Sequence, residues 1–385
     1  MILEIDGLTH SYGGESAVED VSFGLERGEL VAVLGPSGCG KTTLVQAIAG
    51  HVRPTDGRIR LRGEDVTDDP PEARRVGIVF QHSTLFPHLT VAQNVAYGLK
   101  ARDVPPARRE EIVTEFLELV DLSDQREAHP GELSGGQQRR VELARALAPE
   151  PDVLLLDEPL SALDRSLREG LREEIARIQE ETGVTSLFVT HDQEEAMSLS
   201  DRLVVMNDGR VAGIGPPREL YESPPTPFVA SFLGRSNALS ARVIDGTPPR
   251  IEIGDGATRL PVETGDVARE DRSGAREDRS GAIEADGNGL DGSVACHVRP
   301  DDVTLELGSI DGPAPGEDDD HPEVVSLPGV VRRVADVGRR YDVTLELDAG
   351  GELVVERRSL PPDPGEWVRA RIHVDDVMVF DENRE

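Results

Sequence analysis

The sequence contains few cysteines, few aromatic residues and no long hydrophobic run. Only Cys39 and Cys296 occur in 385 residues, so a disulfide framework is excluded and we expect a reducing compartment. No apolar run approaches the roughly 20 residues that span a bilayer, and the N-terminus has no basic and apolar signal region. We therefore expect a chain that reaches a membrane only by binding another protein.

Positive charge is also scarce. The chain has 41 Lys and Arg residues against 74 Asp and Glu residues, a net charge of -33, and its lysines are Lys41 and Lys100. Such a surface repels nucleic-acid backbones and anionic lipid headgroups, and the sequence has no basic patch, so we expect no nucleic-acid partner. The composition resembles that of halophilic proteins, in which concentrated counterions screen the repulsion between carboxylates.

A glycine-rich turn lies between a predicted buried strand, Leu30–Leu34, and a predicted helix over residues 42–49. The turn has the sequence GPSGCGKT over residues 35–42, which matches G-x-x-x-x-G-K-[ST]. In that motif backbone N–H groups bind phosphates, the lysine reaches the β- and γ-phosphates, and the hydroxyl binds Mg²⁺. Chance gives about 0.002 matches in such a chain, so an ordinary glycine turn is a poor explanation. The matching residues are Gly35, Gly40, Lys41 and Thr42.

Two further features have both a structural and a functional interpretation. Tyr12 is either a half-buried surface residue or a ring that stacks on a nucleotide base. The sequence LSGGQ at residues 133–137 precedes a helix that we predict over residues 138–148. Its serine is either a plain N-cap or part of an anion site, because free N–H groups and the positive end of the helix dipole coincide there.

Polar residues follow three predicted strands, over residues 76–80, 153–156 and 185–190. Ligands of open α/β sheets bind at the carboxyl ends of strands, so these side chains are candidates for one site. The residues concerned are Gln81, Asp157, Glu158 and His191. Strands alternate with helices up to residue 214, which predicts a parallel sheet covered on both faces, and residues 85–122 form a helical insertion.

From about residue 236 the pattern changes to short strands without a long helix, which predicts a small β-barrel or barrel-like sandwich. Two insertions, about residues 263–292 and 311–322, are rich in charge and poor in apolar residues, and we expect both to be disordered. The first contains REDRSGA twice, at residues 269–275 and 276–282. The predicted strands are residues 239–244, 294–298, 303–307, 329–334, 341–347, 353–355 and 368–380.

These motifs occur in a specific order: GPSGCGKT, Gln81, LSGGQ, VLLLDEP at residues 153–159, SALD at residues 161–164, and His191. In this order they resemble the ATP-binding subunit of an ABC transporter over about residues 1–235. The later strands, including VRPDDVTL at residues 298–305, look like the transport-associated C-terminal β-domain on ATPases of solute importers.

The resemblance implies an α/β fold of the ABC type of P-loop NTPase. Its parallel-sheet core would be accompanied by N-terminal antiparallel strands and by an inserted helical subdomain at about residues 85–145. A small all-β barrel-like domain would follow over residues 236–385.

The resemblance also implies a role for each motif residue. Tyr12 would stack on adenine, Glu158 would polarise the attacking water, and His191 would contact the γ-phosphate of ATP. Gln81 would contact both that water and Mg²⁺. The residues implied to hold the phosphates are Gly35, Ser37, Gly38, Cys39, Gly40, Lys41, Thr42 and Thr43, and those implied to hold Mg²⁺ are Thr42, Gln81 and Asp157. In a homodimer, the ATP of one subunit would be covered by Ser134, Gly135, Gly136 and Gln137 of the other.

The function implied is ATP hydrolysis coupled to solute uptake through separate permease subunits, at the cytoplasmic face of the membrane, with an extracytoplasmic solute-binding protein as an indirect partner. Ferric iron or polyamine is the favoured solute; thiamine, sulfate, molybdate or tungstate, and sugar are alternatives. A soluble ABC ATPase of repair or translation is a different class, but the chain has one cassette and no heptad run. A GTPase is disfavoured because neither lysine lies in an N-K-x-D motif.

Overall fold

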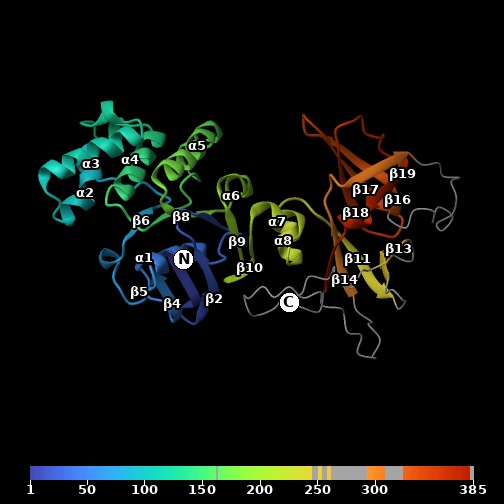
Figure 1. The fold of residues 1–385 in the computed structure, drawn as a ribbon. Coiled ribbons are helices and arrows are strands. Elements are labelled where there is room, and N and C mark those ends of the chain that lie inside the picture. The colour runs from blue at the N-terminus through green and yellow to red at the C-terminus, as the bar shows by residue number, and fades with distance from the viewer. Residues whose placement is uncertain (162–163, 245–249, 254–257, 262–292, 308–323, 382–385) are drawn as a thin grey trace. The chain divides into compact units, whose positions relative to one another are not determined.

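The structure is a computed structural model that describes residues 1–161, 164–244, 250–253, 258–261, 293–307 and 324–381. The chain divides into two compact units, Met1–Glu219 (the first unit) and Leu220–Glu385 (the second unit) (Figure 1). The two insertions expected to be disordered lie outside the described residues. The domain boundary predicted at residue 235 stays a prediction.

A six-stranded sheet in the order β10-β9-β3-β8-β7-β6 forms the centre of the first unit. Five of its strands are parallel, as the alternation of strands and helices predicted, and β10 pairs with β9 in the antiparallel sense. The strands are β3 Leu30–Leu34, β6 Val76–Val79, β7 Val153–Asp157, β8 Thr185–Thr190, β9 Arg202–Asn207 and β10 Arg210–Gly215. Every residue of β3, β7 and β8 is buried, which is typical of strands covered on both faces.

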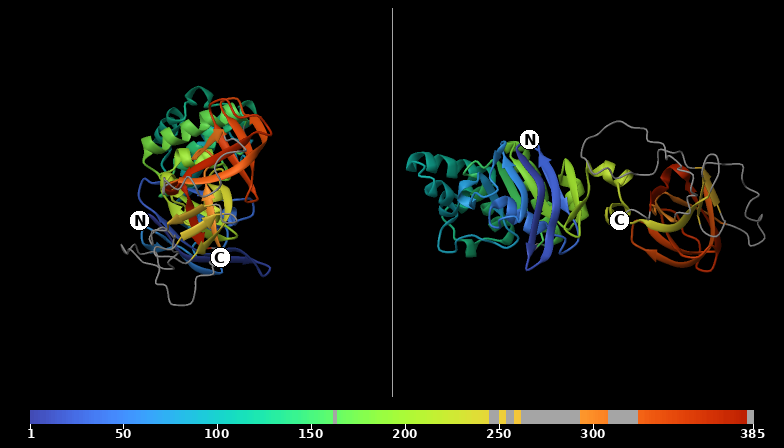
Figure 2. Two further views of the ribbon diagram at one scale, coloured as in Figure 1. Left: turned by 90° about the vertical axis from the view of Figure 1, so that its right-hand side faces the viewer. Right: turned by 90° about the horizontal axis from the view of Figure 1, so that it is seen from below.

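A second sheet of the first unit is antiparallel, in the order β2-β1-β4-β5 (Figure 2). Its strands are β1 Leu3–Tyr12, β2 Glu15–Leu25, β4 Asp56–Leu61 and β5 Glu64–Asp65. Near the N-terminus, the sequence pattern indicates a strand only over residues 2–5, because register shifts after Ile5 and Leu8 interrupt the alternation of apolar and polar residues along β1.

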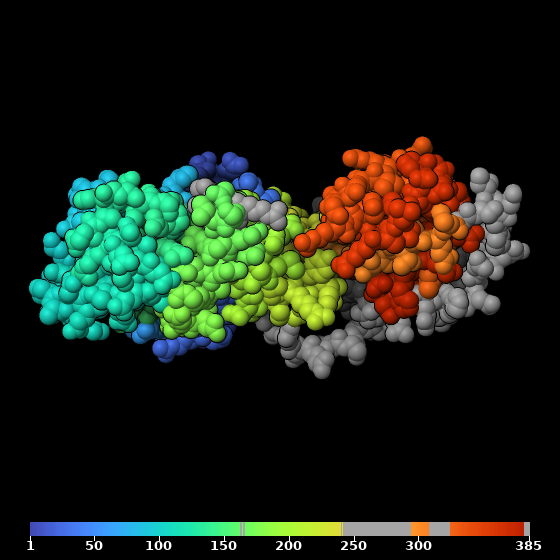
Figure 3. Space-filling model, turned by 90° about the horizontal axis from the view of Figure 1, so that it is seen from above, coloured from blue at the N-terminus to red at the C-terminus, as the bar shows by residue number. Residues whose placement is uncertain are grey.

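Helices of the first unit are α1 Lys41–Ala49, α2 Val91–Ala101, α3 Pro106–Leu119, α4 Gly135–Leu147, α5 Arg165–Thr182 and α6 Gln193–Leu199. The α2–α4 segment lies between β6 and β7 in the sequence and forms a contiguous lobe of the first unit (Figure 3). The prediction of a helix from residue 85 was wrong, since α2 begins after the N-cap Thr90. The predicted start of α4 at residue 138 was also wrong: Ser134 and Gln137 form a capping box that starts the helix at Gly135.

The second unit contains two antiparallel five-stranded sheets, in the orders β13-β12-β11-β14-β20 and β15-β19-β16-β17-β18. The strands are β11 Asn237–Ile244, β12 Arg250–Ile253, β13 Thr258–Pro261, β14 Ser293–Val298, β15 Val303–Leu307, β16 Val324–Asp336, β17 Tyr341–Leu347, β18 Glu352–Arg357, β19 Trp367–His373 and β20 Met378–Asp381. One core of valine and leucine side chains joins both sheets. The all-β prediction is confirmed in its main features.

Three details of this region differ from the sequence analysis. The strand predicted over residues 368–380 is two strands in different sheets, because the 3₁₀ turn Val374–Asp376 separates β19 from β20. The short strands β12 and β13 were not predicted. Neither were the helices α7, Pro217–Glu222, and α8, Pro227–Phe232; in α8 the proline occupies the first turn, where its missing N–H costs nothing. In the described part of the chain, no helix is long and apolar enough to cross a membrane.

Candidate functional site

The phosphate-binding motif lies between the buried strand β3 and the helix α1, as predicted. A Cβ atom at Gly35 would overlap the backbone oxygen of Met206, and one at Gly40 would overlap the backbone oxygen of Ala17. Gly40 also has a φ of 100°, which side-chain-bearing residues rarely adopt. The two glycines of the motif are thus required by close backbone contacts with β9 and β2 as well as by any ligand.

Lys41 is the first residue of α1 and only 6% exposed. Its Nζ donates hydrogen bonds to the carbonyl oxygens of Gly35 (2.7 Å) and Pro36 (2.9 Å), so the ammonium group lies within the turn. The backbone N–H of Leu44 makes the first helical hydrogen bond, to Gly40, which leaves the N–H groups of residues 41–43 without partners inside the helix. An ammonium group and a helix N-terminus at one loop suit a polyphosphate.

The remaining residues of the loop differ in exposure. Ser37, Gly38 and Thr42 are exposed and Thr43 is half-buried, so their polar groups face the solvent side of the loop. Cys39 is buried, with its Sγ 3.8 Å from Lys41 Nζ. Burial raises the pKa of the Cys39 thiol, although the Lys41 charge opposes this effect. The side chain of Cys39 is therefore a packing group of the loop.

Asp157 is the last residue of β7 and only 6% exposed. Burial and the neighbouring charge of Glu158 raise the pKa of Asp157 to about 6, while Lys41 lowers it. A carboxylate that is buried beside a like charge is unfavourable unless a cation compensates it. Oxygen ligands of this type, with the Thr42 hydroxyl, fit Mg²⁺, which prefers carboxylates and hydroxyl or water oxygens.

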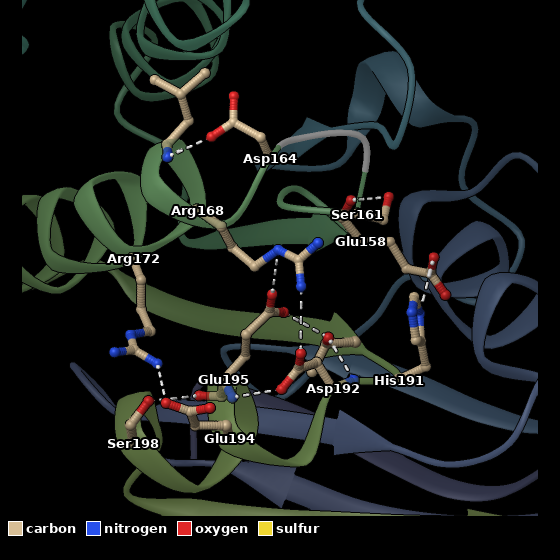
Figure 4. Close-up of polar contacts among 12 residues, drawn as sticks. Glu158, Ser161, Asp164, Arg168, Arg172, His191, Asp192, Glu194, Glu195 and Ser198 are labelled. Atoms are coloured by element: carbon tan, nitrogen blue, oxygen red, sulfur yellow. Dashed lines mark hydrogen bonds and ion pairs between the residues drawn. The ribbon is translucent and has the colours of Figure 1, made fainter. Parts of the chain in front are cut away.

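Glu158 lies beside Ser161 and His191 (Figure 4), and its carboxylate also contacts the segment that follows β6. Its carboxylate oxygen Oε2 accepts a hydrogen bond from Gln81 Nε2 (3.1 Å) and lies 3.3 Å from His191 Nδ1. The backbone is held in place because Glu158 N donates to Val189 O (2.9 Å) and Ser161 Oγ donates to Glu158 O (3.0 Å). Residues that follow β6, β7 and β8 are thereby brought together, as the position of the three strands in one sheet requires.

Ser161 is a site residue that the sequence analysis did not assign individually. Besides its bond to the backbone of Glu158, its Oγ accepts a hydrogen bond from Gln81 Nε2 at 3.3 Å. The signal for it was the SALD sequence, which carried the resemblance without a role for its serine. Ser161 thus helps to fix the amide of Gln81 next to the Glu158 carboxylate.

Tyr12 lies at the end of β1, half exposed, with its ring edge-on to His10 at a centroid distance of 4.5 Å. Much of its ring surface is therefore accessible for stacking. Its place next to the turn Gly13-Gly14, where both glycines have positive φ, puts the ring at the tip of the β1–β2 hairpin.

Ser134 is the N-cap of α4 and is exposed. Its Oγ accepts a hydrogen bond from Gln137 N (3.3 Å), and Gln137 Oε1 accepts one from Ser134 N (2.9 Å). Among the described residues, no hydrogen bond joins residues 134–137 to the phosphate loop of the same chain. The structure therefore does not bring Ser134, Gly135, Gly136 and Gln137 together with Lys41 within a single chain.

Comparison with known proteins identifies the family of the chain. Residues 18–161 match the family described as ABC transporter, and residues 297–380 match the TOBE domain. Among solved structures, the chain is similar to CbiO1 of Clostridium perfringens, described as part of the ABC transporter complex CbiONQ, with 32% identity and a TM-score of 0.53. That match covers 57% of this chain and 90% of CbiO1.

Curated relatives match over more of the chain. The spermidine/putrescine import ATP-binding protein PotA of Acidothermus cellulolyticus is 44% identical, over 92% of this chain and 87% of the relative. The Fe(3+) ions import ATP-binding protein FbpC of Rhizobium etli is 40% identical, over 91% and 90%. A sulfate/thiosulfate import ATP-binding protein, CysA of Thermosynechococcus vestitus, is 49% identical, over 66% and 76%. The chain thus belongs to the ATP-binding subunits of ABC importers, which hydrolyse ATP, and carries the C-terminal TOBE domain found in this group.

Proposed function

We propose that two copies of this chain form a head-to-tail dimer that hydrolyses Mg²⁺-bound ATP and thereby drives the import of a polyamine or of ferric iron. The catalytic part of the proposal rests on one observation. Gln81 Nε2 lies 3.1 Å and His191 Nδ1 lies 3.3 Å from the same carboxylate oxygen of Glu158. An oriented carboxylate beside a phosphate loop is what hydrolysis of a phosphoanhydride needs.

The loop residues bind the triphosphate. Lys41 exchanges its bonds to Gly35 and Pro36 for bonds to phosphate oxygens, and the N–H groups at the start of α1 supply the remaining donors. Tyr12 stacks on the adenine ring. Thr42, Asp157 and Gln81 would hold Mg²⁺, directly or through water, and the ion would supply positive charge that offsets the charge of the phosphates.

Glu158 orients the attacking water and accepts its proton. Its carboxylate is held by Gln81 and His191, so the oxygen that faces the water is fixed before ATP binds. His191 Nδ1 lies against Glu158, and the ring would contact the γ-phosphate of bound ATP. Preorganised groups of this kind lower the barrier because they need no rearrangement during the reaction.

Ser134 belongs to the site of the other copy. In one chain its hydroxyl caps α4, and the positive end of that helix faces outward with Gly135 exposed. Placed over the γ-phosphate of a second copy, this helix end adds positive potential where negative charge develops.

Mixing two inactive variants tests the shared site. Ser134→Arg and Lys41→Ala are each expected to be nearly inactive, and their mixture is expected to recover activity, because a mixed dimer has one composite site with both defects and one with neither. Glu158→Gln, which holds ATP without hydrolysing it, is expected to dimerise on addition of Mg²⁺ and ATP in size-exclusion chromatography. A monomeric Glu158→Gln protein together with no recovery on mixing contradicts the proposal.

The proposed solute and the proposed partners are inferred from the relatives of the chain. The polyamine and iron relatives match about nine-tenths of the chain, including the second unit. We therefore propose permease subunits that hold this chain at the cytoplasmic face of the membrane, and an extracytoplasmic binding protein that supplies the solute. In proteoliposomes containing the permeases encoded beside this chain, ATP hydrolysis is expected to increase with binding protein loaded with spermidine or with Fe³⁺. Stimulation by sulfate alone contradicts this assignment.

The acidic composition supports a further part of the proposal, adaptation to concentrated salt. With a net charge of -33, carboxylate repulsion opposes the folded state at low ionic strength. The melting temperature is expected to rise between about 0.1 M and about 1 M KCl, as the screening length falls from about 10 Å to about 3 Å. A melting temperature that is independent of salt would contradict the proposed adaptation to concentrated salt.

A further inference from the structure

Arg139, two residues after the LSGGQ segment, forms a buried ion pair with Glu142 on α4. Arg139 Nη1 lies 2.7 Å from Glu142 Oε2, and the two residues are only 6% and 2% exposed. In the described part of the chain, neither residue is hydrogen-bonded to a side chain of the proposed ATP site, and neither belongs to a motif that the sequence analysis used. Charges are rarely placed in a protein interior unless they are paired and fully hydrogen-bonded, so their remaining partners are informative.

The remaining partners are backbone groups of residues 80–84, the segment that follows β6. The Arg139 guanidinium donates from Nη1 to Phe80 O (2.6 Å) and from Nη2 to Gln81 O (2.8 Å). Glu142 Oε1 accepts a hydrogen bond from Thr84 N (2.6 Å). The planar fork of arginine suits two adjacent carbonyls, so the pair fixes this segment at three backbone positions.

Two other residues of the helical insertion, Arg145 and Asn94, also form hydrogen bonds with the segment that follows β6. Arg145, also on α4, donates to Thr84 O (2.7 Å), and its guanidinium lies 5.5 Å from the ring centroid of Phe86. Asn94 on α2 is fully buried and accepts a hydrogen bond from Phe86 N (2.9 Å). The backbone of residues 80–86 is therefore hydrogen-bonded to side chains of α2 and α4. The side chain of Gln81 is hydrogen-bonded to the carboxylate of Glu158, on the sheet side.

We propose that Arg139 and Glu142 are positioning residues, which fix the amide of Gln81 beside Glu158 and tie its position to the N-terminus of α4. Arg139 lies four residues after Gly135, a rise of about 6 Å along the helix, so a displacement of the LSGGQ end moves the Gln81 backbone with it. Closure of Ser134 over a second subunit's ATP is thereby coupled to the placement of Gln81. This inference rests on the catalytic role proposed for Gln81.

Arg139→Lys is the decisive variant. Lysine keeps the charge that Glu142 requires, but its single ammonium group cannot donate to Phe80 O and Gln81 O in the same planar geometry. Since a misplacement of about 1 Å can cost a factor of about 100, we expect kcat for ATP hydrolysis to fall about tenfold or more. The Kd for Mg²⁺-ATP, measured in a Glu158→Gln background, is expected to stay within about twofold, because the phosphate loop is untouched.

Combination with Gln81→Ala separates positioning from general damage. If Arg139 acts through Gln81, Arg139→Lys is expected to lower kcat by less than about twofold once the Gln81 side chain is absent. An equal loss in both backgrounds overturns the inference. If Gln81→Ala alone has the kcat of the wild type, the proposed role of Gln81 fails, and the inference fails with it for that distinguishable reason.

Arg140→Gln is the matched control, because Arg140 lies on the same helix but contacts Val120 O (3.4 Å), Asp121 (4.0 Å) and Glu174 (3.8 Å). Its kcat is expected to match that of the wild type. Hydrogen exchange gives a readout independent of catalysis: Arg139→Lys and Glu142→Gln are expected to speed exchange in residues 80–86 and not in α1. Unchanged exchange in that segment, or the same loss of kcat in Arg140→Gln, overturns the inference.

Discussion

Both units bury charged or polar side chains, but the surroundings of these groups differ. In the first unit, the buried carboxylate of Asp157 adjoins the like charge of Glu158, which raises its pKa. In the second unit, the guanidinium of the buried Arg299 donates to Tyr221 O (2.9 Å) and Ala230 O (2.5 Å) and lies 4.2 Å from the centre of the Tyr221 ring. The guanidinium of Arg299 is hydrogen-bonded within its own unit, whereas the charge of Lys41 only partly offsets the burial of Asp157 and the like charge beside it. A buried charge is a candidate functional group where burial and a specific charged neighbour together shift its pKa, as at Asp157.

Backbone strain also differs between the two units. Every non-glycine residue with positive φ in the described part of the chain belongs to the first unit, and Glu158, with a φ of 45°, lies in its proposed site. A conformation of this kind costs about 1 kcal/mol or more and persists where surrounding contacts impose it. The hydrogen bonds of Glu158 to Val189 and Ser161 are such contacts. The comparison predicts that changes at the proposed site of the first unit affect catalysis, while changes at the buried charge of the second unit affect folding.

The largest effect is expected at Glu158. Glu158→Gln keeps the shape of the side chain but removes the proton acceptor, so kcat for ATP hydrolysis is expected to fall about 1000-fold. ATP binding and the melting temperature are expected to stay near wild type, whereas Lys41→Ala weakens both binding and hydrolysis. Glu181→Gln, on the exposed part of α5, is the control. Hydrolysis by Glu158→Gln at a near wild-type rate would show that another group activates the water.

Arg299→Met is expected to destabilise the second unit by about 4 kcal/mol, because several buried carbonyl oxygens lose their donor at about 1–3 kcal/mol each. Calorimetry of the full chain measures this as an earlier transition, and ATP hydrolysis at a temperature below it is expected to match wild type. Arg340→Met is the control: its ion pair with Glu356 (2.7 Å) involves an arginine side chain that is 43% exposed, and such pairs contribute less than about 1 kcal/mol. Loss of hydrolysis without loss of stability in Arg299→Met would contradict the comparison.

The sequence predicts features that depend on neighbouring residues better than features that depend on contacts between distant ones. The phosphate loop was predictable because its residues are contiguous, and the strand Thr185–Thr190 was predicted with its observed bounds because it is a short apolar run next to a glycine turn. Gln81, Glu158 and His191 were found as residues at strand ends, but their mutual contacts depend on which strands are neighbours. That order, β8-β7-β6, is a property of the sheet.

The bonds of Arg139 could not be predicted in the same way. They join residues 59 and 58 positions apart, on a helix and on the loop after a strand, and no local pattern records such a pair. In the second unit, the prediction merged β19 and β20 because both are apolar and the turn between them, Val374–Asp376, contains no glycine or proline. Local chemistry thus specified the motifs, and tertiary contacts specified how the motifs are joined.

A smaller effect with a defined sign is expected at Asp157. Because its folded-state pKa is about 6 against an ordinary value of 3.8, the folded state favours the protonated form, and the free energy of unfolding of the nucleotide-free protein falls as pH rises from about 4 to about 6. The shift of about two units corresponds to at most about 3 kcal/mol. Asp157→Asn removes this term, so denaturant titration is expected to find the variant more stable than wild type at pH 7.5 but not at pH 4. A constant difference at both pH values would mean that the carboxylate is compensated.

The smallest effect is expected at His297, and it provides the contrast in the second unit. His297 is buried, with its Nδ1 2.9 Å from Ser236 Oγ, and burial, followed by the Arg299 charge, lowers its pKa. The folded state therefore favours the neutral ring: the stability that this preference contributes is present above pH 6.5, the ordinary pKa, and is lost as pH falls through the lowered value. A glutamine side chain does not titrate in this range. The unfolding transition of His297→Gln is therefore expected to depend less on pH below 6.5 than that of the wild type. His373→Gln, which makes the same substitution at a side chain that is 42% exposed, is the matched control. Because neither residue belongs to the ATP site, ATP hydrolysis at pH 7.5 is expected to be the same in all three proteins. A parallel pH dependence in His297→Gln and wild type would show that the ring is solvated in the folded state.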